Sequence, residues 1–306
     1  MPTQGGLTNA QTHAVREMLR IAGVVDGLST LFVDAGHELH LVGGSVRDAL
    51  LGRLGNDLDL TTDARPEQIQ PLLERFVRGG GKGSGVWDIG KAFGTIGCRY
   101  VDDDGNDWVV EVTTYRSDVY DRESRKPEVA FGDTLEGDLG RRDFTVNAMA
   151  ISLPDQRFTD PYGGLSDLAA GRLRTPATPE ESFSDDPLRM MRAARFAAQL
   201  GFTADASVVQ AMTAMADRIA IISAERVRDE LSKLLLSPLD PETGRGPRVG
   251  LGLLVATGIA DHVLPELPAM QLERDEHHRH KDVYEHSLIV LEQAIELEEE
   301  IGRAHV

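Results

Sequence analysis

Two acidic side chains mark the part of this chain best suited to chemistry. Asp57 and Asp59 lie two residues apart in a segment that reads as a strand (57–60), so both carboxylates project from one face of that strand. Two carboxylates at this spacing hold hard divalent cations such as Mg²⁺, which prefers carboxylates together with phosphate oxygens of a substrate. The pattern therefore indicates a metal site that works on phosphate groups.

A pair of glycines precedes these carboxylates. Gly43 and Gly44 join a short apolar strand (39–42) to a helical pattern (46–51), and Arg47 lies one turn further on. Backbone N–H groups at a helix start bind phosphate, and the helix dipole favours that negative charge. Each feature alone has a simpler interpretation, a tight turn or a solvated strand face. Their order along the chain favours a phosphate cradle beside a metal site, and hence nucleotidyl transfer.

The elements that must position these residues predict two kinds of architecture. Residues before about 175 indicate an α+β unit with a mixed or antiparallel sheet, and the residues after it indicate an all-helical part. In the first part, a polar segment over 116–134 reads as a loop, and an acidic turn over 102–106 predicts a hairpin. The remaining expected strands are 86–89, 94–101 and 107–114, and the expected helices are 8–32, 66–77, 187–200, 204–215, 224–236, 250–257 and 283–301.

Composition restricts the class of protein. The 306 residues carry 32 Lys plus Arg and 50 Asp plus Glu, a formal charge of −18, so any nucleic-acid contact must use local clusters of arginine. A 41% hydrophobic fraction is typical of a packed chain, and the single cysteine, Cys98, reads as a half-buried strand residue without catalytic company. No apolar run approaches the length of a membrane span, so we expect a cytoplasmic protein without a membrane partner.

Several motifs occur in one order along the chain. They are LVGGSVRDALLG with DLDLTT, then EVTTYR, RRDFTVNAMA, DPYGG, DPLRMMRAARFAAQLGF and SAERVRDEL. Together they resemble the class II tRNA nucleotidyltransferases, the CCA-adding enzymes of the polymerase-β superfamily, to which bacterial poly(A) polymerases are closely related. The resemblance covers roughly residues 35–290. It implies a nucleotidyltransferase head (36–175), a helical neck (176–240), and a body with the start of an incomplete HD-like domain (241–306). Ahead of the head, the apolar spacing indicates one or two leading helices (1–35).

The resemblance also implies roles for the residues above. Asp57 and Asp59 match the carboxylates that bind two Mg²⁺ ions, and Gly44 and Arg47 match positions that contact the nucleotide. Glu111 is expected, by analogy within the superfamily, to be a third carboxylate near the metals. An exposed strand glutamate is the simpler interpretation of that residue.

Adjacent arginines form a third candidate feature. Arg141 and Arg142 are suited to bind triphosphate oxygens in a bidentate manner, and in the family this motif contacts the incoming nucleotide. The alternative is a surface ion pair with Asp138 or Asp143, which would contribute little to stability.

Base recognition is expected from the segment that starts at Asp186. Asp186 and Arg189 are three residues apart on one helical face, so they offer an acceptor beside a donor, which matches cytosine and adenine but not uracil or guanine. In the family the corresponding residues read the base in this way, and Arg192 and Arg195 are implied nucleotide or primer contacts. The alternatives are a helix N-cap at Asp186, with Pro187 as the first helical residue, and a solvated basic stripe.

The expected activity is therefore Mg²⁺-dependent addition of CCA to tRNA from CTP and ATP, without a nucleic-acid template. Alanine at position 92 departs from the basic signature common in bacterial poly(A) polymerases, and the length of the 116–129 segment favours full CCA addition over a CC-adding variant. Poly(A) polymerase and CC-adding or A-adding enzymes remain alternatives, and a phosphohydrolase or RNA-binding module is the alternative from a different class. The acidic ending at 296–300 and the absence of an HD His-Asp pair are typical of a fragment of a longer protein.

Overall fold

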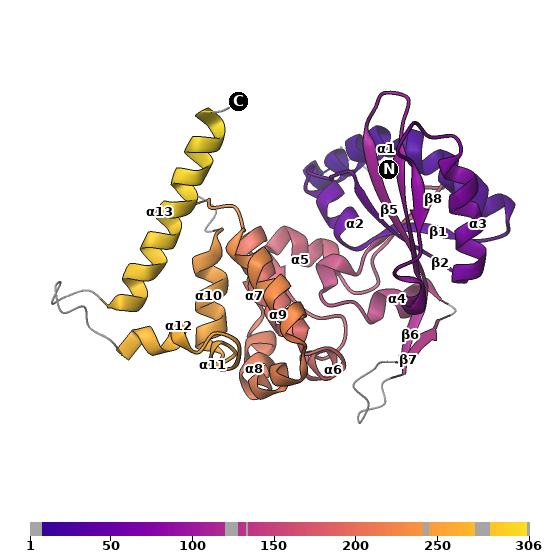
Figure 1. Cartoon of the computed structure of the whole chain (residues 1–306). Helices are drawn as coiled ribbons and strands as arrows, with labels where there is room; N and C mark the ends of the chain where they lie inside the picture. The colour runs from indigo at the N-terminus through magenta and orange to yellow at the C-terminus, as the bar shows by residue number, and fades with distance from the viewer. Residues whose placement is uncertain (1–7, 120–127, 133, 241–244, 273–281, 305–306) are drawn as a thin grey trace, which may run out of the picture. The chain divides into compact units, whose positions relative to one another are not determined.

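The computed structural model of this chain describes residues 8–119, 128–132, 134–240, 245–272 and 282–304 (Figure 1). The chain divides into two compact units, Met1–Leu168 and Ala169–Val306. No helix in the described ranges is both long and apolar enough to cross a bilayer.

The first unit is built on a seven-stranded sheet with the order β3-β4-β5-β2-β1-β8-β9. Every neighbouring pair is antiparallel except β2 and β5, which run parallel, so the expected mixed α+β fold is confirmed. The strands are β1 (Leu39–Val42), β2 (Asp57–Thr62), β3 (Gly85–Trp87), β4 (Thr95–Val101), β5 (Asp107–Thr114), β8 (Ala150–Leu153) and β9 (Phe158–Thr159).

Alternation along the strands separates two faces of this sheet. Leu58 and Leu60 of β2 are buried, whereas the alternate residues Asp57 and Asp59 are exposed, and β5 alternates in the same way. Helices α1 (Asn9–Asp34) and α3 (Pro66–Val77) cover the apolar face, where Phe76 of α3 stacks on Tyr100 of β4 (Figure 1). The opposite face carries the acidic side chains.

The helices of the first unit largely match their sequence patterns. The segment expected to hold one or two leading helices forms the single helix α1, which starts in a capping box where the Thr8 side chain accepts the Gln11 N–H. The helix α3 has the predicted bounds, with Pro66 in its first turn. The shorter elements are α2 (Gly43–Leu50), η1 (Lys91–Phe93), α4 (Leu135–Gly140), η2 (Thr145–Asn147) and α5 (Gly164–Ala170).

Two local expectations were wrong in the first unit, and one strand was not expected. The polar segment 116–134 is not simply a loop, because β6 (Arg116–Val119) and β7 (Glu128–Phe131) pair as an antiparallel ribbon; its residues 120–127 and 133 lie outside the described residues. The helix after β1 begins at Gly43 itself rather than at residue 46. The stretch after Asp143 forms a single 3₁₀ turn, η2, and then enters the sheet as β8, which has no predicted counterpart.

The second unit is helical, as expected, apart from one two-residue parallel pair, β10 (Arg172–Leu173) with β11 (Thr203–Ala204). Pro187 lies just before helix α7, whose C-terminus is closed by Gly201 in the left-handed conformation. Part of the predicted HD-like opening, 273–281, lies outside the described residues, and the finer segment boundaries stay predictions. The elements are α6 (Pro179–Asp185), α7 (Leu188–Leu200), α8 (Ala206–Ala214), η3 (Ala216–Ile221), α9 (Ala224–Leu235), α10 (Pro247–Ala256), α11 (Ala260–Val263), α12 (Glu266–Ala269), η4 (Met270–Leu272) and α13 (Val283–Ala304).

Candidate nucleotide and metal site

Strand register brings three carboxylates together on the acidic face of the first unit. Asp59 of β2 is the register partner of Glu111 of β5, and Asp57 lies two residues before Asp59 on the same face. Burial raises the pKa of the Glu111 carboxyl, and the negative charges of Asp59 and Asp57 raise it further. The three groups therefore interact electrostatically, and a cation among them would relieve their mutual repulsion.

The acidic group is an open site rather than a closed cage. Among the described residues, no three acid, histidine or cysteine side chains already converge as a complete set of metal ligands. Mg²⁺ commonly takes only one or two protein carboxylates and completes its octahedron with water and substrate phosphates. Asp57 and Asp59, exposed side by side, fit that mode of binding, with Glu111 as the neighbouring third carboxylate.

Ser45 of α2 fixes the backbone of the two aspartates. Its hydroxyl oxygen accepts the Asp59 N–H at 2.9 Å, and the hydroxyl lies 3.3 Å from the Asp57 carbonyl oxygen as a donor. A single buried side chain thus ties the start of α2 to the strand that carries the carboxylates. Ser45 was not among the predicted site residues, although it directly follows the glycine pair in the sequence.

Gly43 lies beside both a basic and an acidic group of the site. It adopts a left-handed backbone conformation (φ +67°), and a β-carbon built on it would lie 2.8 Å from Arg142 Nη1 and 3.9 Å from Asp59 Oδ2. The α2 N-terminus has no side-chain cap among the described residues, so its first backbone N–H groups are available to an anion. Gly43, Arg142 and Asp59 therefore lie close together, as a phosphate site beside a metal site would require.

A buried carboxylate holds both arginines of the predicted triphosphate site. Asp138 is 0% exposed; its Oδ1 accepts from Arg141 Nε and Nη2 at 3.2 Å, and its Oδ2 accepts from Arg142 Nη2 at 3.0 Å. Burial would raise the pKa of Asp138, but the charges of Arg142 and Arg141 outweigh it and lower that pKa. Arg142 Nε is buried without a hydrogen-bond acceptor in the described part of the chain, and a substrate oxygen could supply one.

The alternative interpretation of the arginine pair was thus partly right about the partner and wrong about its location. Asp138 does pair with Arg141 and Arg142, but it is buried and not a surface residue. Because the Asp138 carboxylate is buried, its hydrogen bonds fix the orientation of both guanidinium groups. A surface ion pair would hold them only weakly.

Arg47 is held in place by a second network. Its Nε and Nη2 donate to Asp48, and its Nη1 donates to Asn147 Oδ1 at 2.7 Å. The Asn147 amide in turn donates to Asp143 Oδ1. The Arg47 guanidinium also lies beside Gly44, where a β-carbon would be 3.4 Å from Nη2. Arg47 is therefore fixed next to the glycine pair by Asp48 of its own helix and by Asn147 of η2.

The second unit holds the predicted base-reading residues. Helix α7 begins at Leu188, and Asp186 ends α6 rather than starting α7, although its Oδ1 still accepts the Leu188 N–H. Asp186 Oδ2 accepts from Arg226 of α9 at 2.7 Å. Arg189 is 8% exposed and donates to the Ser182 hydroxyl at 2.9 Å. The two residues are neighbours along the chain, but each is oriented by a different partner.

Arg192 and Arg195 share one acidic partner, Glu230 of α9. Arg195 is 9% exposed and donates to Glu230 Oε2 at 2.6 Å, and its guanidinium lies over the Phe196 ring. Arg192 lies 3.7 Å from Glu230 and keeps a third of its side chain exposed. The geometry favours a structural role for Arg195, whereas Arg192 has surface available for a ligand. Sequence analysis missed Glu230, because its partner lies on another helix.

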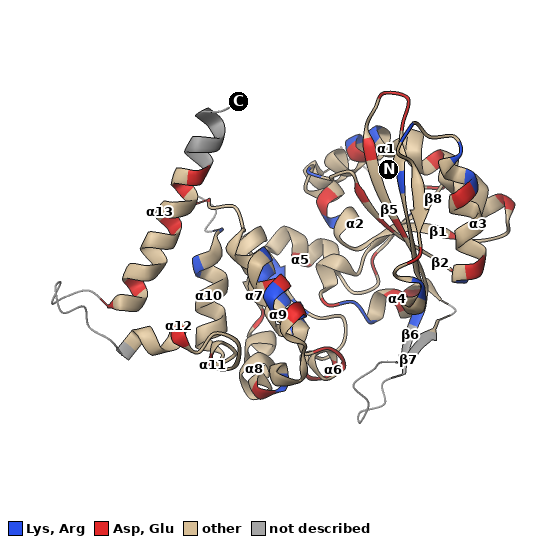
Figure 2. Cartoon of the chain, viewed as in Figure 1, with Lys and Arg blue, Asp and Glu red and all other residues tan. Residues whose placement is uncertain are grey.

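Basic and acidic residues alternate along several elements of the described chain (Figure 2). Figure 2 shows acidic and basic residues interleaved within each unit, for example along α9. With a net charge of −18, contact with phosphate must depend on local groups such as the Arg142 and Arg47 clusters.

Comparisons with known proteins agree with this arrangement. Residues 39–174 match the model of the Poly A polymerase head domain, and residues 201–270 match that of the Probable RNA and SrmB- binding site of polymerase A. The CCA-adding enzyme of Bacillus subtilis (strain 168) is 37% identical over 246 residues, which cover 80% of this chain and 55% of that protein. The chain therefore spans about half the length of the curated relatives it matches.

Solved structures of CCA-adding enzymes are also similar to this chain. The Bacillus stearothermophilus CCA-adding enzyme in complex with CTP matches with a TM-score of 0.63 and 33% identity, over 79% of this chain and 52% of that one. The Thermotoga maritima CCA-adding enzyme complexed with tRNA_CCA matches with a TM-score of 0.62 and 25% identity, over 85% of this chain and 56% of that one.

Proposed function

Since this chain belongs to the family of CCA-adding enzymes and poly(A) polymerases, we propose that it adds the 3′-terminal CCA sequence to tRNA. CTP and ATP are the nucleotide substrates, tRNA is the acceptor, and no nucleic-acid template is needed. The observation that carries the proposal is the meeting of Gly43, Arg142 and Asp59, which puts an anion cradle directly beside a metal-binding carboxylate.

The incoming nucleotide binds through its triphosphate to the first unit. Backbone N–H groups at the start of α2 and the guanidinium of Arg142 receive the phosphate oxygens, and Asp138 keeps that guanidinium oriented. Arg47, fixed by Asn147, adds positive charge at the same helix start. These groups are positioned before the substrate arrives, so little reorganisation is needed when it binds.

Members of the family are nucleotidyltransferases, which generally use divalent metal ions, and we propose Mg²⁺ for this chain. Asp57 and Asp59 would hold it, with Glu111 alongside. Bound there, Mg²⁺ would supply the charge that lowers the pKa of the attacking 3′ hydroxyl and steadies the departing pyrophosphate. Ser45 keeps the two aspartates in register for that task.

Selection of the base belongs to the second unit in this proposal. Asp186 offers a carboxylate acceptor and Arg189 a guanidinium donor, which together match the adjacent donor and acceptor of cytosine and of adenine. Arg226 and Ser182 orient the two side chains, each from a different helix.

Poly(A) polymerase is the second candidate, favoured by the match to a head domain of that name. The two activities share the site and differ in the product: three nucleotides from CTP and ATP on tRNA, or a long tail from ATP alone. Product length on a tRNA acceptor separates them.

The proposal is tested by removing a metal ligand without changing the shape of the side chain. Asp59→Asn should reduce nucleotide incorporation into tRNA at least about a thousandfold while the thermal unfolding temperature stays within a few degrees of the wild type. Asp103→Asn, the same change in the exposed hairpin turn, should keep full activity. Incorporation that survives in Asp59→Asn would overturn the proposed role of the acidic site.

A further inference from the structure

The acidic face of the sheet continues past the carboxylates to an aromatic side chain. Asp59 of β2 pairs in register with Glu111 of β5. Glu111 pairs in turn with Gly97 of β4, and Gly97 pairs with Trp87 of β3. Register partners project from the same face, so these four residues form one row across four strands. At about 4.8 Å between neighbouring strands, Gly97 lies about 10 Å from Asp59.

Gly97 makes room for the tryptophan. A β-carbon built on Gly97 would overlap the Cε2, Nε1 and Cζ2 atoms of the Trp87 indole, so the ring lies directly on the backbone of β4. Gly97 is buried under it, although Glu111 on the neighbouring strand is exposed. The strand is thus shaped to carry a ring on the same face as the catalytic carboxylates.

Trp87 remains partly exposed in this position. The other tryptophan of the chain, Trp108, is 3% exposed and donates a hydrogen bond from Nε1 to Asp102. A buried tryptophan usually has such a partner for its indole N–H. The connection from β3 to β4 adds two more exposed apolar side chains, Ile89 and Phe93. An aromatic ring left open beside a polar site is suited to stack on a flat ligand.

The position of the Trp87 ring distinguishes between two ligands, the incoming nucleotide and the acceptor RNA. The anion cradle at Gly43 follows β1, which adjoins β2 on one side, whereas Glu111, Gly97 and Trp87 extend from β2 on the other side. In phosphoryl transfer the attacking and leaving oxygens lie roughly in line through the phosphorus atom. When the triphosphate occupies the Gly43 side, the attacking 3′ hydroxyl approaches from the Trp87 side. The base next to Trp87 therefore belongs to the acceptor RNA.

We propose that Trp87 is a stacking platform for a base at the 3′ end of the acceptor RNA. The inference rests on the proposed function and assigns a binding residue to it. Stacking on an aromatic ring tolerates every base, so the same residue serves the acceptor end before and after each addition.

Fluorescence tests the contact directly, without turnover. In the Trp108→Phe chain, Trp87 is the sole tryptophan, and its emission is followed as RNA is added in the presence of a chelator and without nucleotide. A tRNA transcript ending at the discriminator base should quench Trp87, and the same RNA with an abasic 3′-terminal residue should bind with much weaker quenching. Equal quenching by the two RNAs, or RNA binding in a gel-shift assay with no quenching, would overturn the proposal.

Kinetics test its consequence for the reaction. Trp87→Leu should raise the KM for RNA about 10- to 100-fold and leave the KM for CTP nearly unchanged, whereas Trp87→Phe should keep most of the RNA affinity. Trp108→Phe is the matched control and should change neither KM. A rise in the KM for CTP alone would mean that the ring stacks on the incoming nucleotide, and this would contradict the assignment to the acceptor RNA.

The two arms separate this inference from the proposed function. A wild-type chain that incorporates no nucleotide would refute the proposed function, while the fluorescence arm still decides whether a 3′-terminal base stacks on Trp87. Where Trp87→Leu fails to fold, Trp87→Phe and the fluorescence arm decide the question.

Discussion

The Arg142 guanidinium lies where a side chain on Gly43 would have to go, with Nη1 2.8 Å from the position of a β-carbon. The glycine is thus required twice, for its left-handed backbone and for the space it leaves to the Arg142 guanidinium. The relationship links two motifs that are almost a hundred residues apart in the sequence.

Gly43→Ala should therefore weaken nucleotide binding. The left-handed conformation costs a non-glycine residue about 1–2 kcal/mol, and the new methyl group displaces Arg142, so we expect the KM for CTP and ATP to rise about tenfold or more. Steady-state kinetics on a tRNA acceptor measure this. Gly23→Ala in α1 is the control, because a β-carbon there meets nothing within 4 Å; it should leave KM unchanged and stabilise the helix by up to about 1 kcal/mol. Equal KM values for Gly43→Ala and the wild type would contradict the phosphate cradle.

Asp138→Asn should lower both stability and nucleotide affinity. Removal of the buried charge leaves Arg141 and Arg142 without their counter-ion, which costs about 3–5 kcal/mol in comparable buried pairs. Urea unfolding would measure the loss, and the KM for nucleotide should rise with it. A variant as stable as the wild type at neutral pH would show that Asp138 does not hold the arginines.

The difference in unfolding free energy between the wild type and Asp138→Asn should depend on pH, because the pKa of Asp138 is lowered in the folded chain. A group whose pKa is lower in the folded state contributes stability above its unfolded pKa, about 3.9, and loses it as the pH falls through the folded value. The stability gap between the wild type and Asp138→Asn should therefore be constant from neutral pH to about pH 5 and close in stronger acid. A gap that widens on acidification would contradict the ion pair.

Cys98 should be inert in the folded chain. It is fully buried in β4, and burial raises the pKa of its thiol to about 12, so almost no thiolate exists near neutral pH. A disulfide reagent such as 5,5′-dithiobis(2-nitrobenzoate) at pH 8 should label the native chain negligibly within minutes and label one thiol per chain in urea. Stoichiometric labelling of the native chain would show that β4 opens readily.

Arg189→Ala should reduce the selectivity of nucleotide addition. A bidentate base contact is worth about 1–3 kcal/mol of discrimination, so the preference for CTP and ATP over UTP and GTP should fall about tenfold or more. The ratio of kcat/KM values measures selectivity independently of any general loss of activity.

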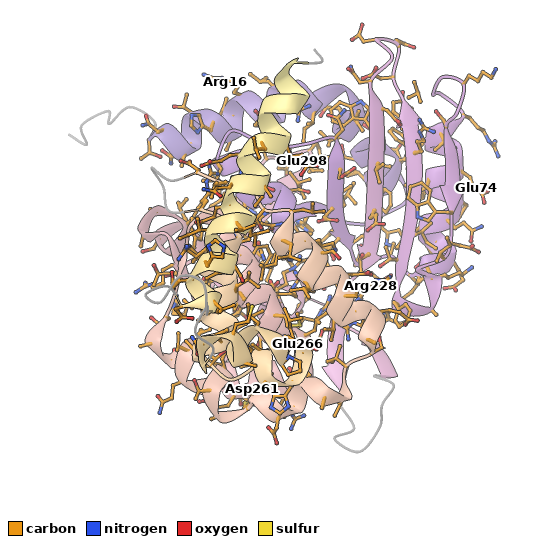
Figure 3. The ribbon with its side chains drawn as sticks, turned by 60° about the vertical axis from the view of Figure 1, so that its left-hand side comes forward. Arg16, Glu74, Arg228, Asp261, Glu266 and Glu298 are labelled. Atoms are coloured by element: carbon orange, nitrogen blue, oxygen red, sulfur yellow. The ribbon has the colours of Figure 1, made fainter. Side chains whose placement is uncertain are left out.

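Arg228→Ala is the matched control for that experiment. Arg228 lies on α9 (Figure 3) with 72% of its side chain exposed, and its guanidinium pairs with the neighbouring Asp229. It should keep wild-type selectivity. If the two variants discriminate equally well, Arg189 does not read the base.

Local patterns in the sequence predicted much of the fold. The bounds of β1, α3 and β5 follow from short apolar runs, a proline in the first helical turn and strict alternation, all of which act within one element. The strand β8 was missed because only its pairing with β1, more than a hundred residues away, makes Ala150–Leu153 a strand. The ribbon of β6 and β7 was missed for a different reason, since three of the four residues of β6 are polar or charged and such residues are not typical of a strand.

The candidate site shows the same division. Asp57, Asp59 and the glycine pair stand out because residue type and spacing alone indicate their chemistry. The residues that position them do not stand out in the sequence. The sequence alone does not show that Asp138 is buried, and the partners of Ser45, Asn147 and Glu230 lie in other segments of the chain. Sequence patterns thus indicate the candidate substrate-binding groups better than the residues that hold those groups in place.

Product length on a defined acceptor tests the central claim most directly. The purified chain is incubated with Mg²⁺ and a tRNA transcript that ends at the discriminator base, with CTP, ATP, both, or UTP, and the products are separated on a sequencing gel. The account predicts two additions with CTP, a third only when ATP is also present, and none with UTP. A long ladder with ATP alone, or no addition with any nucleotide, would contradict it.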